Sequence, residues 1–549
     1  MREAVLKACA FNILVCLLLP ATAAAQSGSL ESVIAATPVY DLAIHVIPDS
    51  HRIEVAGTVR LPKRDKPQAT IEMNLSELMT DFQVQIVEPA ANAGPLELVK
   101  ENKKEADEHF VRWTLRPKIP IAANQSVRLH FSYGGGEKSD FVFYIGPEGS
   151  FGGGANTLWY PQLEENDGRA RGQLRFSVPA GYTVLATGEN RGIGAEEAKG
   201  NFNFENELPS HFSFAAGKYT ILERGGSVPM RAYLLHPREN IQGYLDGCTK
   251  ILAVLSKEFG PYPYKTFAIA EVPTGPALRA GFTGASFNSF MLANKEALDQ
   301  PFNLAYYGHE IGHQWWGNLV THADEPHGDY LLDEALAQFG SMRVVETVDG
   351  PAAAEEYRRN GYPGYIPSQC GYGYLRFAKY GKDHALYDLP NDPNSHLLAD
   401  NKGFFVWDML ARVVGPEQFS KVLHEITEKY KFRTIRWDEF VAAVQSTSKE
   451  DLGWFFSEWF ERKGAPDWHV TWKQDGNAVR GEIKQAEPFY RVQLEVETIG
   501  VNGESVVHMV DTKEVQTELN WPVSFQVRDV VVDPHYHILH WTPSIEAPK

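Results

Sequence analysis

Two histidines and a glutamate stand at a spacing that suits a metal ion. Residues 309–313 read His-Glu-Ile-Gly-His, within a pattern typical of a helix. Because residues four apart on a helix share a face, both imidazoles can reach one ion while Glu310 lies alongside and holds a metal-bound water. Zinc is suited to two neutral nitrogens and one carboxylate, with a fourth position left open for catalysis. The pattern therefore predicts a catalytic zinc centre at His309 and His313.

The third ligand of such a centre is expected on a following helix. The apolar, periodic segment LLDEALAQF, residues 331–339, supplies Glu334. We therefore predict that one zinc ion binds per chain, on His309, His313 and Glu334.

The secondary structure that the sequence predicts around these residues changes along the chain. Short alternating runs up to about Leu222, separated by Gly, Pro, Asn and Asp, predict β structure. A helical period follows to about Gly464, and alternation then returns. We predict an α+β multidomain protein. The predicted domains are an N-terminal β domain at 30–225, a mainly α catalytic domain at 226–465 and a C-terminal β domain at 466–549.

The first 25 residues have the pattern of a secretory signal peptide. Arg2 and Lys7 precede an apolar stretch, and a run of small residues ends at Ala25. The apolar part, Phe11 to Leu19, is too short to span a bilayer. We therefore expect a secreted or periplasmic protein, without stable membrane insertion after signal cleavage.

The composition is that of a folded, acidic protein. Of the 549 residues, 43% are hydrophobic, and the formal net charge is -18. A nucleic-acid-binding surface needs a basic patch, so this charge argues against nucleic acid as a partner. Cys248 and Cys370 follow the predicted signal, and whether they form a disulfide is left open, as is the oligomeric state.

Residues His309 to Phe339 resemble the zinc site of the aminopeptidase-N-type (gluzincin) metallopeptidase family. In that family His-Glu-x-x-His-x-Trp-x-Gly-Asn precedes a helix that begins with an Asn-Glu-Gly/Ala pattern, and this chain has HEIGHQWWGN followed by DEA. The likeness continues on both sides of the site. It covers 168–189, 212–219, 259–273 and 451–467.

The resemblance implies a fold and a mechanism. The fold would be an N-terminal β saddle, a thermolysin-like catalytic domain and a small C-terminal β domain. His309, His313 and Glu334 would bind zinc, which polarises the scissile carbonyl of a peptide or protein substrate and activates water. Glu310 would act as general base and pass the proton to the leaving amine.

The spacing between the second histidine and the glutamate ligand departs from the family pattern. Twenty residues, 314–333, separate His313 from Glu334, which is two more than the family has. The segment around Glu334 matches the family's ligand helix, so we place the additional residues in the loop 323–328.

A second departure concerns the substrate's amino terminus. The family's Gly-Ala-Met-Glu-Asn segment has a glutamate that holds the free amine, whereas Arg279 to Leu292 here contain no acidic residue. An ammonium group in a cleft needs an opposite charge. Cleavage at the amino terminus and internal cleavage therefore both remain open.

A third departure concerns the oxyanion. The family's Tyr-x-Lys-Gly reads Asp-Asn-Lys-Gly here, with Asp400 in place of the tyrosine whose hydroxyl stabilises the oxyanion. An ionised carboxylate cannot donate that hydrogen bond. Tyr374, Tyr380 and Tyr387 are candidate substitutes, and with Asp400 they mark a candidate oxyanion or substrate region.

Two functions follow from these patterns. The first is a zinc-dependent metallopeptidase, with aminopeptidase specificity left open. The alternative is a catalytically weak or inactive zinc-bearing protein that binds peptides on the same scaffold. The complete His-Glu-x-x-His segment favours the enzyme, because losing one oxyanion donor typically lowers the rate by about 100- to 1,000-fold without abolishing it.

Overall fold

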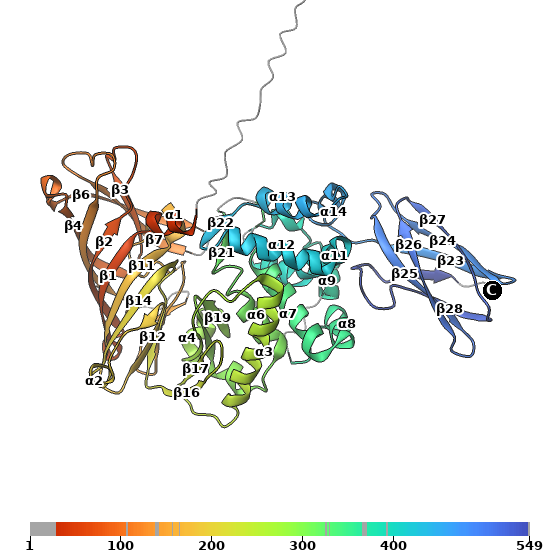
Figure 1. Cartoon of the computed structure of the whole chain (residues 1–549), viewed down its shortest axis with the longest axis horizontal. Helices are drawn as coiled ribbons and strands as arrows, with labels where there is room; N and C mark the ends of the chain where they lie inside the picture. Colours follow the sequence, from red (N-terminus) through yellow and green to blue (C-terminus); the bar gives the residue numbers. More distant parts are fainter. Residues whose placement is uncertain are drawn as a thin grey trace, which may run out of the picture.

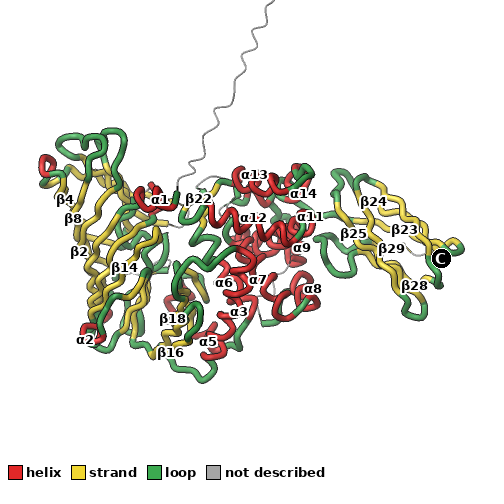
Figure 2. The backbone as a smooth tube through the Cα atoms, in the orientation of Figure 1, coloured by secondary structure: helices red, strands yellow, loops and turns green. Residues whose placement is uncertain are grey.

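The computed structural model describes residues 29–546, apart from 106–107, 138–141, 156, 164, 324–326, 329, 365–370 and 391–392. Strands dominate the N-terminal and C-terminal parts of the chain, and helices gather between them (Figures 1 and 2). The predicted α+β multidomain class is confirmed. The domain boundaries stay predictions, and the predicted signal peptide lies outside the described residues.

Three sheets build the N-terminal part. Their strands are β1 (Val39–Ile47), β2 (Arg52–Leu61), β3 (Ile71–Ser76), β4 (Met79–Glu88), β5 (Gly94–Pro95), β6 (Glu97–Glu105), β7 (Glu108–Arg116), β8 (Val127–Gly135), β9 (Phe143–Tyr144), β10 (Ser150–Gly152), β11 (Ala170–Ser177), β12 (Thr183–Ala186), β13 (Glu189–Asn190), β14 (Asn201–Ser210) and β15 (Phe214–Gly217). The largest sheet has the order β13-β14-β11-β1-β2-β8-β4-β5, and the others are β3-β7-β6 and β12-β15-β10-β9. Alternate residues of β1, such as Leu42, Ile44 and Val46, enter the core that the three sheets share.

A five-stranded sheet opens the central part. Its strands are β16 (Thr220–Arg224), β17 (Met230–Leu234), β18 (Phe267–Val272), β19 (Gly284–Phe287) and β20 (Phe290–Asn294), in the order β16-β17-β18-β20-β19. β17, β18 and β20 run parallel, and every residue of β18 is buried, as its apolar sequence leads one to expect. β19 returns antiparallel to β20 and forms one edge.

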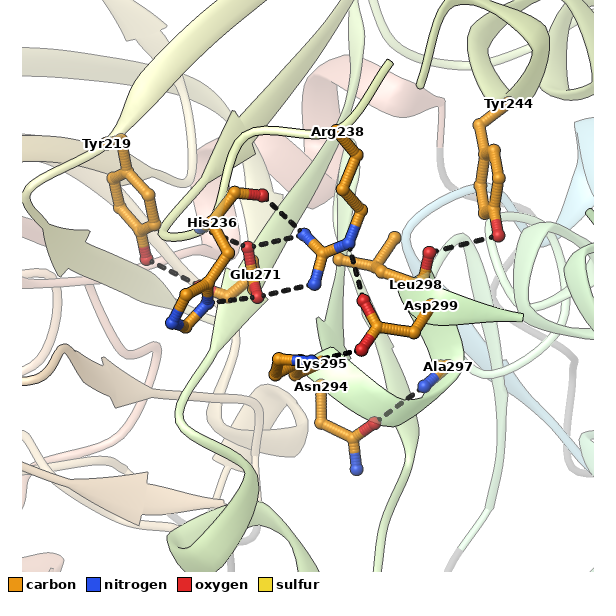
Figure 3. A network of polar contacts seen from close by, with 10 residues as sticks. All are labelled: Tyr219, His236, Arg238, Tyr244, Glu271, Asn294, Lys295, Ala297, Leu298 and Asp299. Carbon is orange, nitrogen blue, oxygen red and sulfur yellow. Dashed lines mark hydrogen bonds and ion pairs between the residues drawn. The ribbon is translucent and has the colours of Figure 1, made fainter. Parts of the chain in front are cut away.

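An ion-pair network around the buried Glu271 fixes the end of β18 to the segments around it (Figure 3). Glu271, whose side chain is fully buried, accepts hydrogen bonds from Arg238 (2.8 and 2.9 Å) and from Nδ1 of His236 (2.8 Å). Arg238 also donates to Asp299 (2.8 Å), the last residue of α5 (Lys295–Asp299). Burial alone would raise the pKa of Glu271, but the hydrogen bonds outweigh it and lower the pKa. The carboxylate is therefore charged and ties the sheet to α5.

Helices α3 (Ile241–Phe259), α6 (Leu304–Gly312), α7 (Glu334–Asp349) and α11 (Phe404–Val414) share one core with this sheet. A π-helical turn, Ala399–Gly403, joins α10 (Pro393–Leu398) to α11. The short strands β21 (Val320–His322) and β22 (Arg433–Ile435) pair in parallel. The remaining helices are α1 (Leu30–Ala36), α2 (Gly194–Glu197), α4 (Thr274–Arg279), α8 (Pro351–Asn360), α9 (Tyr374–Lys379), α12 (Pro416–Lys429), α13 (Trp437–Thr447) and α14 (Gly453–Trp459).

The C-terminal part consists of two sheets. Their strands are β23 (Trp468–Asp475), β24 (Ala478–Gln485), β25 (Val492–Gly500), β26 (Ser505–Thr512), β27 (Gln516–Pro522), β28 (Val527–Val532) and β29 (Ser544–Glu546), in the orders β27-β24-β23-β29 and β26-β25-β28. Trp459 of α14 lies against Tyr490 at this end, with ring centroids 4.8 Å apart, so the sheets continue the core of the helices.

Two sequence expectations concern membranes and cysteines. Among the described helices, none combines the length and the apolar character needed to cross a membrane. Cys248 is a buried, free thiol of α3, whereas Cys370 lies outside the described residues.

Candidate metal centre

Two glycines let the helix of the histidine pair approach the helix of the third predicted ligand. A Cβ on Gly308 would lie 3.1 Å from a Cα of α7, and a Cβ on Gly312 would lie 3.0 Å from another. Side chains at these positions would therefore push the two backbones apart. His309, in the last turn of α6, and His313, which caps its C-terminus, meet Glu334 at the first position of α7.

The three predicted ligands converge on one point. Nε2 of His309 lies 3.1 Å from Nε2 of His313 and 3.3 Å from Oε2 of Glu334, and the His313–Glu334 distance is 3.5 Å. Zinc bonds of about 2.0–2.1 Å in a tetrahedral site separate neighbouring ligand atoms by about 3.3 Å. The triangle therefore fits a zinc-sized ion.

A carboxylate next to Glu334 orients His313. Nδ1 of His313 lies 2.8 Å from Oδ1 of Asp333, and donating its hydrogen there leaves Nε2 free to bind metal. Gly317 makes this approach possible, because a Cβ on it would lie 2.3 Å from the same oxygen, and its φ of +93° also favours glycine. Asp333 is thus part of the site, although the sequence analysis did not single it out.

Glu334 is held in its charged form. Burial would raise the pKa of its carboxyl, but the nearby His396 and His313 outweigh burial and hold the pKa well below its ordinary value. A metal ligand must be deprotonated, so this setting suits the role predicted for Glu334.

Glu310 lies between the histidine pair and the edge strand β19. Its side chain is buried, and burial raises its pKa. A Cβ on Gly284 of β19 would lie 2.8 Å from Oε1 of Glu310 and 2.1 Å from the hydroxyl of Tyr306. The acid-free stretch therefore runs directly beside the predicted general base.

Curated relatives of the chain are aminopeptidases and a related hydrolase. Rat aminopeptidase B is 24% identical over 388 residues, 63% of this chain and 56% of the relative. Leucine aminopeptidase 2 of Ajellomyces capsulatus is 25% identical over 234 residues, 40% of this chain and 35% of the relative. A leukotriene A-4 hydrolase homologue of Botryotinia fuckeliana is 25% identical over 323 residues, 53% and 47%.

The chain is similar to aminopeptidases of the gluzincin family, at about 25% identity. No family model matches it. The chain spans about half the length of the curated relatives it matches.

The relatives overturn the predicted localisation. The relatives matched are mainly intracellular eukaryotic aminopeptidases, which contradicts the expectation of a secreted or periplasmic protein. The expectation rested on the order of charged, apolar and small residues in 1–25.

The four residues of the candidate oxyanion region lie in different settings. Asp400 is fully buried in the π-helical turn, 3.1 Å from Nε2 of His396. Tyr374 is buried and donates a hydrogen bond to Asp383 (2.6 Å). Tyr380 follows α9 and has 77% of its surface exposed. Tyr387 stacks on His327, with ring centroids 4.7 Å apart. Asp400 is the candidate that the structure brings close to the predicted ligand Glu334.

His396 belongs to the site, and the sequence analysis missed it. Its Nε2 lies 3.6 Å from Oε2 of Glu334, and the carboxylates of Glu334 and Asp400 raise the pKa of its imidazole to about 10. The available signal was its position four residues before Asp400, which places the two on one helix face.

The structure describes only part of the loop 323–328, in which we placed the two residues that lengthen the spacing between His313 and Glu334. Residues 324–326 lie outside the described residues, while His322 is on β21 and His327 lies 3.8 Å from Asp388. The placement of the additional residues at 323–328 stays a prediction.

Proposed function

We propose that this protein is a zinc-dependent metallopeptidase of the gluzincin type that hydrolyses peptide bonds with a metal-activated water. The observation that carries the proposal is the triangle of His309, His313 and Glu334, with Glu310 beside it. The relatives support the same class, because aminopeptidase B and leucine aminopeptidase 2 are among them.

The residues divide the chemistry between them. His309, His313 and Glu334 would hold one zinc ion, which supplies Lewis acidity and lowers the pKa of a bound water. Glu310 takes the proton of the attacking water and delivers it to the leaving amine. Burial raises its pKa, which favours its accepting a proton from water.

The edge strand offers a way to hold the substrate. β19 pairs with β20 along one side, and an extended peptide can add to the other side of an edge strand through backbone hydrogen bonds. Since Gly284 of β19 adjoins Glu310, a peptide so bound would pass next to the general base. The partner is therefore a peptide or protein substrate.

Two finer points belong to the same proposal. The three parts of the chain correspond to an N-terminal β saddle, a thermolysin-like catalytic domain and a C-terminal β domain. The tetrahedral oxyanion forms in the region of Asp400, Tyr380 and Tyr387, without a hydrogen bond from the family tyrosine. The alternative of a catalytically weak peptide-binding protein is not favoured by relatives named as aminopeptidases and hydrolases.

Replacing Glu310 by glutamine tests the proposal. Glu310→Gln should keep its zinc and lose about 100- to 10,000-fold in turnover, because an amide cannot accept the proton. Zinc content and peptide hydrolysis are measured on the same preparation, with the exposed Glu296→Gln as the matched control. Equal turnover in Glu310→Gln and wild type would remove Glu310 from the mechanism. Hydrolysis that a chelator does not inhibit would show that the reaction does not need a metal ion.

A further inference from the structure

His396 lies between two carboxylates, one of which is the predicted zinc ligand Glu334. Its Nε2 is 3.1 Å from Oδ2 of Asp400, within hydrogen-bond range, and 3.6 Å from Oε2 of Glu334, which is an ion-pair contact. Asp400 is fully buried, whereas 44% of the His396 side chain is exposed. The buried carboxylate therefore holds a partly exposed imidazole in place, and the imidazole in turn contacts Glu334.

The backbone brings these three residues together. His396 and Asp400 are four residues apart, at the point where α10 passes into the π-helical turn. A Cβ on Gly403, the last residue of that turn, would lie 2.6 Å from the Cβ of Ala335, the residue after Glu334. A side chain at position 403 would therefore hold the turn away from α7, and with it the pair of His396 and Asp400.

A second contact restricts the imidazole of His396. Its ring meets the ring of Tyr330 edge to face, with centroids 6.3 Å apart. Tyr330 precedes Leu331, whose carbonyl accepts a hydrogen bond (3.2 Å) from the indole of Trp407 in α11. The segment just before α7 is thus tied to α11, so Tyr330 and Asp400 together keep the imidazole beside Glu334.

The site contains a comparable pair at one of the predicted histidine ligands. Asp333 accepts a hydrogen bond (2.8 Å) from Nδ1 of His313, which orients that imidazole toward the metal. Asp400 and His396 act one step further out, because His396 contacts the carboxylate of a ligand. Carboxylate ligands in metal sites are themselves held by hydrogen-bonding partners, and losing such a partner typically lowers metal affinity about 10- to 100-fold.

We propose that Asp400 and His396 form a pair that positions Glu334 for zinc binding. At the place of the family tyrosine, Asp400 anchors the imidazole that holds a metal ligand. The ion pair carries no net charge, so it holds Glu334 without repelling the zinc ion. The inference rests on the zinc centre of the proposed function and on no step of peptide hydrolysis.

Zinc affinity, measured by competition with a chromogenic chelator, tests the role of His396. His396→Ala should bind zinc about 10- to 100-fold more weakly than wild type. His396→Gln, whose amide can donate a hydrogen bond, should recover part of that affinity. His535→Ala is the matched control and should bind zinc like wild type, because its imidazole pairs with Glu355 (3.2 Å) rather than with a metal ligand.

A double-substitution cycle tests whether Asp400 acts through His396. Asp400→Asn should weaken zinc binding in the wild-type background but change it by less than about twofold in His396→Ala, because the imidazole it anchors is already gone. Denaturant unfolding of the zinc-free variants separates a loss of stability from a loss of positioning.

The cobalt-substituted protein gives a readout that a merely structural role would not change. Co²⁺ absorption reports the coordination geometry, so the visible spectrum of fully loaded His396→Ala should differ from that of wild type and of His535→Ala. Wild-type zinc affinity or an unchanged cobalt spectrum in His396→Ala, or additive effects of the two substitutions, would each overturn the proposal. A wild type that binds zinc but hydrolyses no peptide would contradict the proposed function alone.

Discussion

At the scale of single residues, the unusual feature of this site is that the strand beside Glu310 lacks an acidic residue that could pair with a substrate's amino terminus. The strand that adjoins Glu310 has the sequence Gly-Ala-Ser-Phe, and Phe287, its last residue, is buried against Phe290. A buried phenyl ring carries no negative charge that could offset the ammonium group of a peptide's amino terminus. The strand itself therefore gives no preference for a free amine.

The absence of that charge leads to a prediction about substrates. Acetylating the amino terminus of a good peptide substrate should change kcat/KM by less than about tenfold, because no carboxylate of residues 279–292 interacts with the amine. Matched free and acetylated peptides are compared on one enzyme preparation. A loss of about 1,000-fold on acetylation would show that a carboxylate outside this stretch, such as Asp324 or Glu325, anchors the amine.

At the scale of elements, the metal centre depends on how closely α6 and α7 approach. Gly308 and Gly312 lie on the face of α6 that meets α7, and the two catalytic histidines each follow one of them in the sequence. Interiors are close-packed, so a methyl group in a contact of about 3 Å must move one backbone. Glycine at these positions is therefore part of what sets the distance between the histidines and Glu334.

Gly312→Ala should separate these helices. We expect the free energy of unfolding to fall by about 1–3 kcal/mol and zinc affinity to fall at least tenfold. Gly243→Ala in α3, where a new Cβ meets nothing within 4 Å, is the control and should raise stability by about 0.5–1 kcal/mol. Denaturant unfolding measures the stability of both variants, and zinc titration measures their affinity for the metal. Unchanged zinc affinity in Gly312→Ala would show that the helix contact does not set the site.

At the scale of the whole molecule, buried polar contacts join the N-terminal sheets to the segment just after the histidine pair. Arg169, almost fully buried, donates to the carbonyl of Asn318 (2.9 Å) and to Oγ1 of Thr321 (3.2 Å). Nε2 of His211 donates to the carbonyl of Asp167 (2.5 Å), which fixes the loop that carries Arg169. The N-terminal part thus helps to hold in place α6, the helix that carries His309.

This junction should make the protein sensitive to acid. Burial lowers the pKa of His211 below 6.5, so its contribution to stability is complete above that pH. Below it, the unfolded chain takes up a proton that the folded chain does not, and the free energy of unfolding falls by up to about 1.4 kcal/mol per pH unit.

His211→Gln tests this dependence, because glutamine can donate a hydrogen bond but does not titrate. Unfolding by denaturant between about pH 7.5 and pH 5.5 should show a smaller loss of stability in His211→Gln than in wild type. The exposed His45→Gln should lose as much as wild type. If His211→Gln follows the same acid curve as wild type, another group controls the transition.

The sequence by itself determined the features that follow from short-range periodicity. The spacing of His309 and His313 needs one helical face, and the alternation in β1 needs one buried side of a sheet, so both could be predicted from neighbouring residues. Glu334 was found because its helix has a recognisable pattern. The order of charged and apolar residues in 1–25, by contrast, led to a predicted localisation that the relatives contradict.

Only the tertiary structure decided which distant side chains share the site. Asp400 and His396 meet Glu334 because Gly403 lets the π-helical turn lie against α7, a contact between segments more than sixty residues apart in the sequence. Tyr380, an equal candidate in the sequence, points into solvent instead. Residue type and spacing specify what a side chain can do. Which partners it meets depends on the packing of whole helices, which local patterns do not contain.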